Sequence, residues 1–181
     1  KSEAEIMTEL GADKKNLEKL FNREIKGFAV PFDYYSDFIE DCTKKCGFEY
    51  ARISEETLSF KPQTDYHRWK ATVFHLDESL EKLSNDFVSC DEELALLQVV
   101  GHSYDLDTEN MWDRIESVFR KISSHSDILP MTTIEIIDYL KAMEQVEITE
   151  SYIHNLSEQS LWFSVNGTVC KAEPKSIVEI K

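Results

Sequence analysis

The sequence predicts an α/β protein with a small β-rich appendage at its C-terminal end. Short apolar segments alternate with amphipathic helical segments as far as Met143, and a pattern of short strands follows. Such alternation is typical of βαβ units, which build a parallel sheet or barrel. The chain has 181 residues, 41% of them hydrophobic, which is enough for one main domain. We therefore expect a (β/α) portion over residues 1–143 and an appendage over residues 144–181.

The first part of the chain contains one predicted helix and then a strand and helix pair. Apolar residues recur at helical spacing over residues 6–21, interrupted by Gly11, which predicts one amphipathic helix or two short ones. A short apolar segment at residues 25–31 predicts a strand. Ser36 is a candidate N-cap for the next helix, which we expect to end before Gly47.

The middle of the chain repeats the unit of strand and helix. Residues 48–53 and 72–75 have the composition of strands, and Asp77 is a candidate N-cap for the helix after them. Residues 94–100 are continuously apolar apart from Gln98, which is typical of a strand buried on both faces of a parallel sheet.

The last predicted elements lie on either side of the expected domain boundary. Thr108 is a candidate N-cap for a helix reaching Ile122, residues 128–131 predict a short strand, and Thr133 is a candidate N-cap for a helix to about Met143. In the tail, two strand-like segments flank Asn166 and Gly167, the dipeptide that favours a type I′ hairpin turn. Residues 176–180 add a third strand.

Composition excludes several classes of partner. Asp and Glu number 35 against 20 Lys and Arg, and the net charge of −15 opposes nucleic-acid binding. The longest apolar run, residues 94–100, is far shorter than the ~20 residues that cross a bilayer, so we expect no membrane span. Residues 1–5 do not resemble a signal peptide and are typical of an interior cut, so any export signal would precede Lys1 and the location stays open.

Short motifs add little to the functional prediction. The four cysteines form no C-x-x-C pair, so we predict neither a disulfide nor a zinc site. Asn155 and Asn166 each begin an N-x-S/T glycosylation pattern, which is short and common by chance. The sequence contains no P-loop, no G-x-G-x-x-G and no G-x-S-x-G, which removes the usual markers of nucleotide and serine-hydrolase chemistry.

Two histidines follow predicted strands, where catalytic side chains of parallel sheets are found. His102 follows residues 94–100 and is a candidate general acid or base, because an imidazole titrates near neutral pH. The structural alternative is a histidine that caps the next turn near Ser103 or Asp105, and position alone does not separate the two. His75 follows residues 72–74, although a nearby helix cap at Asp77 offers a local explanation for it.

Aromatic side chains near these strand ends are candidates for stacking on a sugar ring. They are Trp69, Phe32, Tyr34 and Tyr35. Core packing is the commoner role of aromatic residues, so the pattern favours a carbohydrate partner only weakly.

Several segments carry a family resemblance: residues 16–20, 37–39, 46–52 and 133–139, together with G-F-A-V-P-F at 27–32, R-W-K-A-T-V-F-H at 68–75, V-G-H-S-Y-D-L-D at 100–107 and N-M-W-D-R-I-E at 110–116. Together they resemble a bacterial branch of the polysaccharide deacetylase family, the metal-dependent carbohydrate esterases that include chitooligosaccharide deacetylases. The resemblance covers roughly residues 5–143 and corresponds to the C-terminal half of the family domain. It implies a partial, distorted (β/α) barrel with a small C-terminal β-hairpin appendage.

The resemblance implies hydrolysis of N- or O-acetyl groups on a carbohydrate. His102 matches the family histidine that protonates the leaving group, and Phe32 matches a residue whose backbone N–H helps to bind the oxyanion. The other residues expected to bind the oxyanion or substrate are Pro31, Trp69, His75 and Tyr35. Ala29 stands where many members have Arg, and Asp33 replaces the usual Gly.

The family's metal ligands, one Asp and two His for a zinc-like divalent metal, belong to motifs that would precede Lys1. We therefore expect no metal to be held by this chain alone, and we expect the chain alone to be inactive. The expected partners are a carbohydrate substrate and the N-terminal half of the same domain. The alternatives are a non-catalytic glycan-binding or scaffold domain, and an acidic globular domain with no glycan role.

Overall fold

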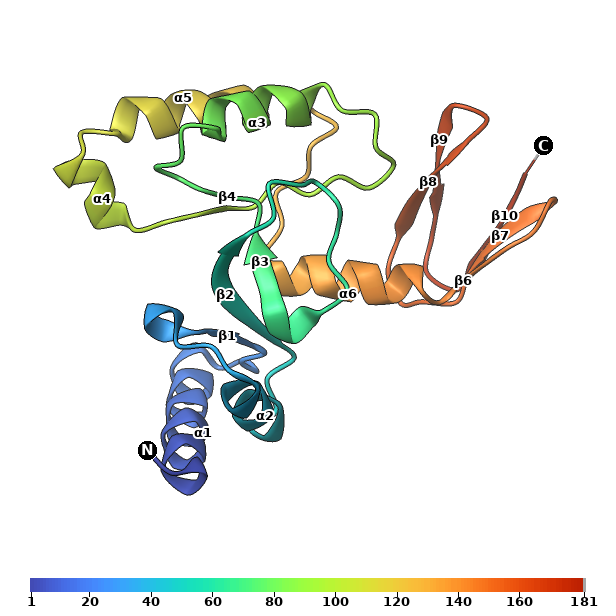
Figure 1. Cartoon of the computed structure of the whole chain (residues 1–181). Coiled ribbons are helices and arrows are strands. Elements are labelled where there is room, and N and C mark those ends of the chain that lie inside the picture. The colour runs from blue at the N-terminus through green and yellow to red at the C-terminus, as the bar shows by residue number, and fades with distance from the viewer. Residues whose placement is uncertain (181) are drawn as a thin grey trace. The chain divides into compact units, whose positions relative to one another are not determined.

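The computed structural model describes residues 1–180 and contains two units, Lys1–Leu129 and Pro130–Lys181, which we describe separately. The expected mixture of α/β elements with parallel strands, followed by small antiparallel sheets, is confirmed (Figure 1). The strands of residues 1–180 form open sheets and no closed barrel. No helix within these residues is long and apolar enough to cross a membrane. The expected boundary between a deacetylase-like portion, residues 1–143, and an appendage, residues 144–181, stays a prediction.

Parallel strands organise the first unit. The strands are β1 (Gly27–Ala29), β2 (Tyr50–Glu56), β3 (Trp69–Ala71), β4 (Val73–Phe74) and β5 (Val99–Val100). One sheet has the order β1-β2-β3 and the other pairs β4 with β5, all in parallel. A bend at Thr72 separates β3 from β4, so the expected strand at residues 72–75 is in fact the end of a longer, interrupted segment.

The prediction of a long buried strand at residues 94–100 is wrong. Only Val99 and Val100 form β5, and both are half-buried. The residues before β5 form separate backbone hydrogen bonds and no regular strand pairing. The Leu96 N–H donates to the Phe60 carbonyl at 2.8 Å, and the Gln98 carbonyl accepts from the Thr72 N–H at 2.8 Å. Within this apolar run, Leu97 and Val99 pack against the core cluster, whereas Leu94 is exposed.

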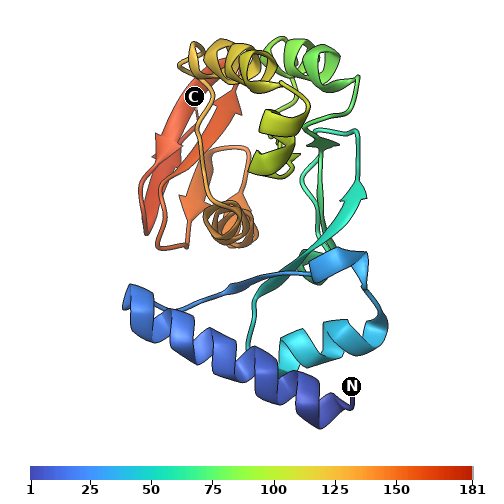
Figure 2. The same ribbon diagram turned by 90° about the vertical axis from the view of Figure 1, so that its left-hand side faces the viewer.

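The helices of the first unit lie where the apolar spacing predicted them, but several of their N-cap residues differ from the predicted ones. They are α1 (Glu3–Phe21), α2 (Asp37–Lys45), α3 (Leu80–Val88), α4 (Ser103–Thr108) and α5 (Trp112–Ser123), with short 3-10 turns η1 (Pro31–Asp33) and η2 (Tyr66–Arg68). α1 is continuous through Gly11, and α1 and α2 lie side by side (Figure 2). The Ser36 cap is confirmed, because its hydroxyl accepts from the Ile39 N–H.

Three local predictions in this unit are wrong. Thr108 ends α4 instead of capping α5, whose N-cap is Met111. Asp77 accepts from Ser79, the residue that stands at the N-cap of α3. Residues 128–131 form no strand. The first two errors concern side chains that bond within their own turn, Thr108 to the Tyr104 carbonyl and Asp77 to Ser79.

The largest apolar cluster of the first unit joins three helices to β4. It consists of Val73, Leu80, Leu83, Leu106, Ile115 and Val118. Because α3, α4 and α5 all contribute, the end of β4 and the turn into α4 are held by the same packing. Burial of aliphatic side chains contributes about 1.5–3 kcal/mol each, so this packing fixes the strand end firmly.

The second unit contains α6 (Thr133–Met143) and two antiparallel sheets. Thr132, one residue before the predicted position, caps α6 in a capping box with Glu135. The strands are β6 (Val146–Ile148), β7 (Tyr152–Asn155), β8 (Leu161–Val165), β9 (Thr168–Ala172) and β10 (Ser176–Glu179). The β8–β9 hairpin is confirmed, with positive φ at Asn166 and Gly167. β10 pairs with β7 and not with the hairpin.

The two glycosylation patterns lie in opposite environments. Asn155 is fully buried, and its side-chain amide donates to the carbonyls of Gln159, Ala172 and Glu173. Asn166 is exposed in the hairpin turn. Asn155 is therefore a structural residue of the second unit, and its amide is already used within the fold.

Candidate functional site

The parallel pair of β4 and β5 brings two predicted site residues to one edge of the sheet. Val73 pairs with Val99 and Phe74 with Val100, so the next residue of each strand leaves at the same end. The His75 N–H donates to the Val100 carbonyl at 2.8 Å. The strand-end position expected for His75 and His102 is therefore confirmed.

His75 is buried at this edge, with 4% of its surface exposed. Its Nδ1 lies 3.3 Å from the Val100 carbonyl oxygen, and its ring lies over Gly101. A Cβ at position 101 would come within 1.4 Å of the His75 Nδ1. Only glycine permits this approach, and the buried ring has no free face for the substrate contact expected of His75.

His102 occupies the open side of the same edge. Its side chain is 57% exposed, and its Nδ1 lies 3.2 Å from the Asp105 Oδ2. The ring stacks on Tyr104, with centroids 4.9 Å apart and planes at 19°. The contact with Asp105 bears out the structural alternative. The role of His102 as a general acid or base stays a prediction, for which the exposed ring leaves room.

Asp105 is the site residue whose role the sequence did not reveal. It lies in the first turn of α4, three residues after His102, and its side chain is mostly buried. The same oxygen, Oδ2, lies 3.7 Å from the His75 Nε2. The H-S-Y-D spacing in the sequence could have signalled the contact with His102, whereas the contact with His75 depends on the pairing of β4 with β5.

Arg114 of α5 holds the segment that follows β4. Its guanidinium donates to the His75 carbonyl at 3.1 Å and to the Asp77 carbonyl at 2.6 Å. It also forms an ion pair with Glu81, and this contact lowers the pKa of the Glu81 carboxyl. Arg114, which lies 39 residues from His75 in the sequence, therefore holds the backbone of residues 75–77 in place.

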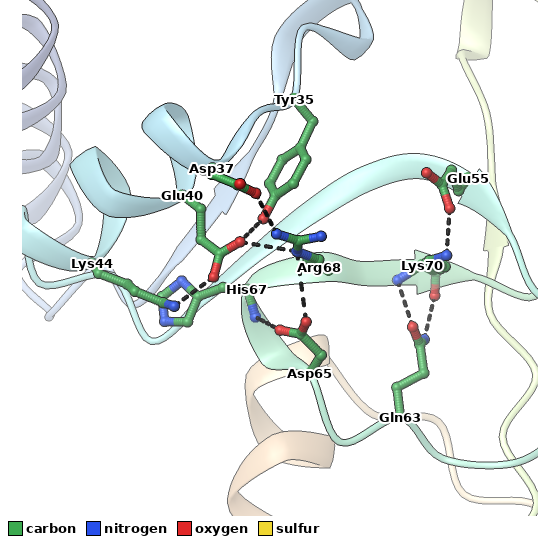
Figure 3. A network of polar contacts seen from close by, with 10 residues as sticks. All are labelled: Tyr35, Asp37, Glu40, Lys44, Glu55, Gln63, Asp65, His67, Arg68 and Lys70. Carbon is green, nitrogen blue, oxygen red and sulfur yellow. Dashed lines mark hydrogen bonds and ion pairs between the residues drawn. The ribbon is translucent and has the colours of Figure 1, made fainter. Parts of the chain in front are cut away.

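Tyr35 is part of a separate polar network (Figure 3). Its hydroxyl donates to Glu40, and its ring lies under the Arg68 guanidinium at 5.3 Å. Burial raises the pKa of Tyr35, and the contact with Glu40 raises it further. The tyrosine is engaged within the fold, so its hydroxyl is not free for a substrate.

Arg68 and Glu40 form the centre of this network. The Arg68 guanidinium donates to Glu40 at 2.9 Å and to Asp37 at 2.6 Å. Lys44 on the same helix also pairs with Glu40. The hydrogen bond from Lys44, followed by those from Tyr35 and Arg68, lowers the pKa of Glu40 to about 2.

The remaining predicted substrate contacts lie in two different environments. Trp69 is fully buried, and its indole N–H donates to the Gln98 side chain; no ring face is open to a sugar, which corrects that expectation. Pro31 and Phe32 are exposed in η1, and Phe32 is 89% exposed with a φ of 54°. Among the side chains that the structure describes, Pro31, Phe32, Tyr34 and Tyr35 form no hydrogen bond, ion pair or ring contact with His102.

Metal-ligating groups do not converge in the described part of the chain. Among the side chains that the structure describes, no three or more His, Cys, Asp or Glu residues form a cluster suited to a metal ion. The four cysteines are free thiols. The described side chains therefore provide no ready set of metal ligands, and the expectation that this chain alone holds no metal stays a prediction.

No protein-family model, curated protein or solved structure matches this chain. The geometry at the β4–β5 edge and the sequence motifs around it are therefore the grounds for a function.

Proposed function

We propose that the chain is the C-terminal part of a carbohydrate deacetylase domain of the distorted (β/α) barrel type, and that His102 acts in it as a general acid. The observation that carries the proposal is the exposed imidazole of His102 at the carboxyl end of β5, held by Asp105. The resemblance of the segments around Pro31, Trp69 and His102 to deacetylase motifs supports the same conclusion.

The contact with Asp105 assigns a role to each ring nitrogen of His102. A carboxylate only accepts hydrogen bonds, so the Nδ1 that lies 3.2 Å from it carries a hydrogen. The opposite nitrogen, Nε2, is then the one that exchanges a proton with a bound substrate. Hydrolysis of an acetamide or acetyl ester needs such a group, because the departing amine or alkoxide must gain a proton.

The proposed reaction does not draw on a metal held by this chain. In the complete domain a divalent metal would polarise the acetyl carbonyl, but the described residues provide no ligand set for it. The steps assigned to this chain are therefore orientation of His102 by Asp105 and proton transfer at the His102 Nε2.

Acetate release tests the proposal. The protein in its full encoded length is incubated with acetylated chitooligosaccharide or acetylated xylan, with zinc present, and acetate is measured. We expect His102→Ala to lower the rate by about 10²–10⁴-fold, the range of general acid catalysis. His125→Ala is the matched control, because His125 is also an accessible histidine near an aspartate. Absence of acetate, or equal rates in wild type and His102→Ala, would overturn the proposal.

A glycan-binding domain without turnover is the second candidate. Exposed aromatic side chains favour it, since Phe32, Tyr34 and Tyr104 present open rings and aromatic faces suit the C–H faces of sugars. Metal analysis and NMR titration with chitooligosaccharide distinguish the two. Binding that perturbs Tyr104, together with no bound metal and no acetate, would support this candidate.

A further inference from the structure

Both ring nitrogens of the buried His75 face oxygen atoms that only accept hydrogen bonds. Nδ1 lies 3.3 Å from the Val100 carbonyl oxygen, and Nε2 lies 3.7 Å from the Asp105 Oδ2. The Nε2 atom is buried and makes no hydrogen bond. A neutral imidazole has one donor nitrogen and one acceptor nitrogen. A neutral His75 therefore matches only one of the two oxygens, whereas an imidazolium matches both.

The oxygen that faces the His75 Nε2 is the one that binds His102. Asp105 Oδ2 lies 3.2 Å from the His102 Nδ1 and 3.7 Å from the His75 Nε2. A buried and an exposed imidazole therefore share one carboxylate oxygen. Any change in hydrogen bonding at His75 acts on the atom that orients His102.

We propose that His75 is a positioning residue that acts on His102 through Asp105. With a proton on Nε2, His75 directs an N–H at the Asp105 Oδ2 from 3.7 Å and attracts the carboxylate electrostatically, which keeps it in place for His102. Without that proton, the Nε2 lone pair faces the carboxylate oxygen and repels it, so the hold on His102 loosens. The inference rests on the proposed function only where it names His102 as the reacting group.

Besides Asp105, three other charged groups lie around His75. Arg114 from α5 donates to the His75 carbonyl, and Glu81 from α3 is paired with that guanidinium. Asp77, two residues further along the chain, is held by Ser79. Asp105 from α4 is the carboxylate whose oxygen faces the ring.

The ring of His75 has little freedom to avoid this contact. The backbone N–H and the ring Nδ1 of His75 both lie close to the Val100 carbonyl oxygen. The ring also occupies the space that a side chain at position 101 would fill. The Phe74 ring lies 4.6 Å away on another side. Because the ring cannot rotate away, a change in the protonation of His75 changes its interaction with the Asp105 carboxylate.

Imidazole NMR of the intact protein tests the inference without substrate. The ¹⁵N resonances of both histidines are followed from about pH 5 to 8, the range in which histidine changes charge. We expect the His102 signals to show a second inflection at the pH where His75 titrates, and Asp105→Asn to abolish it. A single His102 titration, unaffected by His75, would overturn the inference.

Two substitutions at His75 separate positioning from simple packing. His75→Gln keeps an N–H donor for Asp105 but cannot titrate, so neutral His102 should keep one tautomer and its titration should lose the second inflection. His75→Phe removes the donor, and we expect His102 to become a mixture of tautomers. His125→Gln is the control. Unchanged His102 spectra in His75→Phe would contradict the inference.

The outcomes at His75 and in the acetate assay are independent. Because the NMR measurement uses no sugar, a failure to release acetate removes the proposed function and leaves the coupling of the two histidines testable. If His75→Phe does not fold, the NMR titration of the wild-type protein still shows whether His102 responds to His75. Loss of coupling with retained acetate release would remove only the inference.

Discussion

Two polar clusters of the first unit use similar residue types but differ in how their atoms are paired. Around Arg68, each central charge has a close partner of opposite sign, and the aromatic ring of Tyr35 covers the guanidinium. Around Asp105, a buried ring nitrogen of His75 has no hydrogen bond, and an exposed imidazole competes for the same carboxylate.

The comparison suggests different roles for the two clusters. Paired charges and hydrogen bonds of the kind found around Arg68 stabilise a fold and leave nothing available for a ligand. A buried polar atom without a partner is costly, so a native fold that retains one needs a reason outside stability. We therefore expect substitutions around Arg68 to change stability and substitutions around Asp105 to change function.

The largest expected effect is on catalysis at Asp105. Asp105→Asn should lower acetate release by about 100-fold, because an amide does not hold the His102 Nδ1–H as a carboxylate does. The free energy of unfolding should change by less than about 1 kcal/mol. Acetate assays and urea unfolding measure the two effects, with Asp127→Asn near His125 as the matched control. A large loss of stability without a change in rate would reverse the comparison.

Asn155 in the second unit resembles the Arg68 cluster, because its side-chain amide has hydrogen-bond partners at both the oxygen and the nitrogen. Its Oδ1 accepts from the Ser157 N–H and hydroxyl, while its nitrogen donates to three carbonyls. Asn155→Ala should lower the free energy of unfolding by about 3 kcal/mol, since several buried groups lose their partner. Urea unfolding measures this loss. Asn166→Gly, in the exposed turn, is the control, and an equally small loss at both positions would argue against the assignment.

Acid should weaken the Arg68 cluster through Glu40. The pKa of Glu40 falls from 4.5 to about 2 on folding, so the folded state binds this proton less readily than the unfolded state. The resulting stability is present above pH 4.5 and is lost as the pH falls through about 2. We expect a loss of about 1–2 kcal/mol, after allowance for solvent screening.

The acid effect is isolated by comparing wild type with Glu40→Gln. Other carboxyls with lowered pKa, such as Glu81 and Asp77, weaken both proteins in the same direction. The difference in unfolding free energy between the two proteins should therefore shrink as the pH falls from 5 to about 2. Glu116→Gln, at an exposed pair with Arg120, is the control. A difference that is independent of pH would contradict the role of Glu40.

The smallest expected effect is at Lys44. This residue pairs with Glu40 one turn earlier on α2, and exposed helical pairs of this kind contribute little to stability. Lys44→Met should lower the free energy of unfolding only slightly, and this loss should diminish at high salt. Urea unfolding at two salt concentrations measures it. A loss similar to that of Asn155→Ala would mean that Lys44 is essential to the network.

Part of the fold and of the site was predictable because it depends on short stretches of sequence. The Ser36 cap, the α6 helix and the Asn166–Gly167 turn follow from side chains within four residues of one another. His102 was placed correctly at a strand end by the change from apolar to polar residues. The strand at residues 94–100 was predicted too long, because an apolar run does not reveal which of its residues pair.

The sequence by itself determined the alternation of strands and helices, the terminal hairpin and the position of His102 at a sheet edge. Only the tertiary structure decided that Trp69 and His75 are buried, that Gly101 admits the His75 ring, and that Asp105 faces two imidazoles. The physical reason is distance along the chain. His75 meets the Val100 carbonyl across 25 residues and Arg114 across 39, so these contacts exist only after β4, β5 and α5 have packed together.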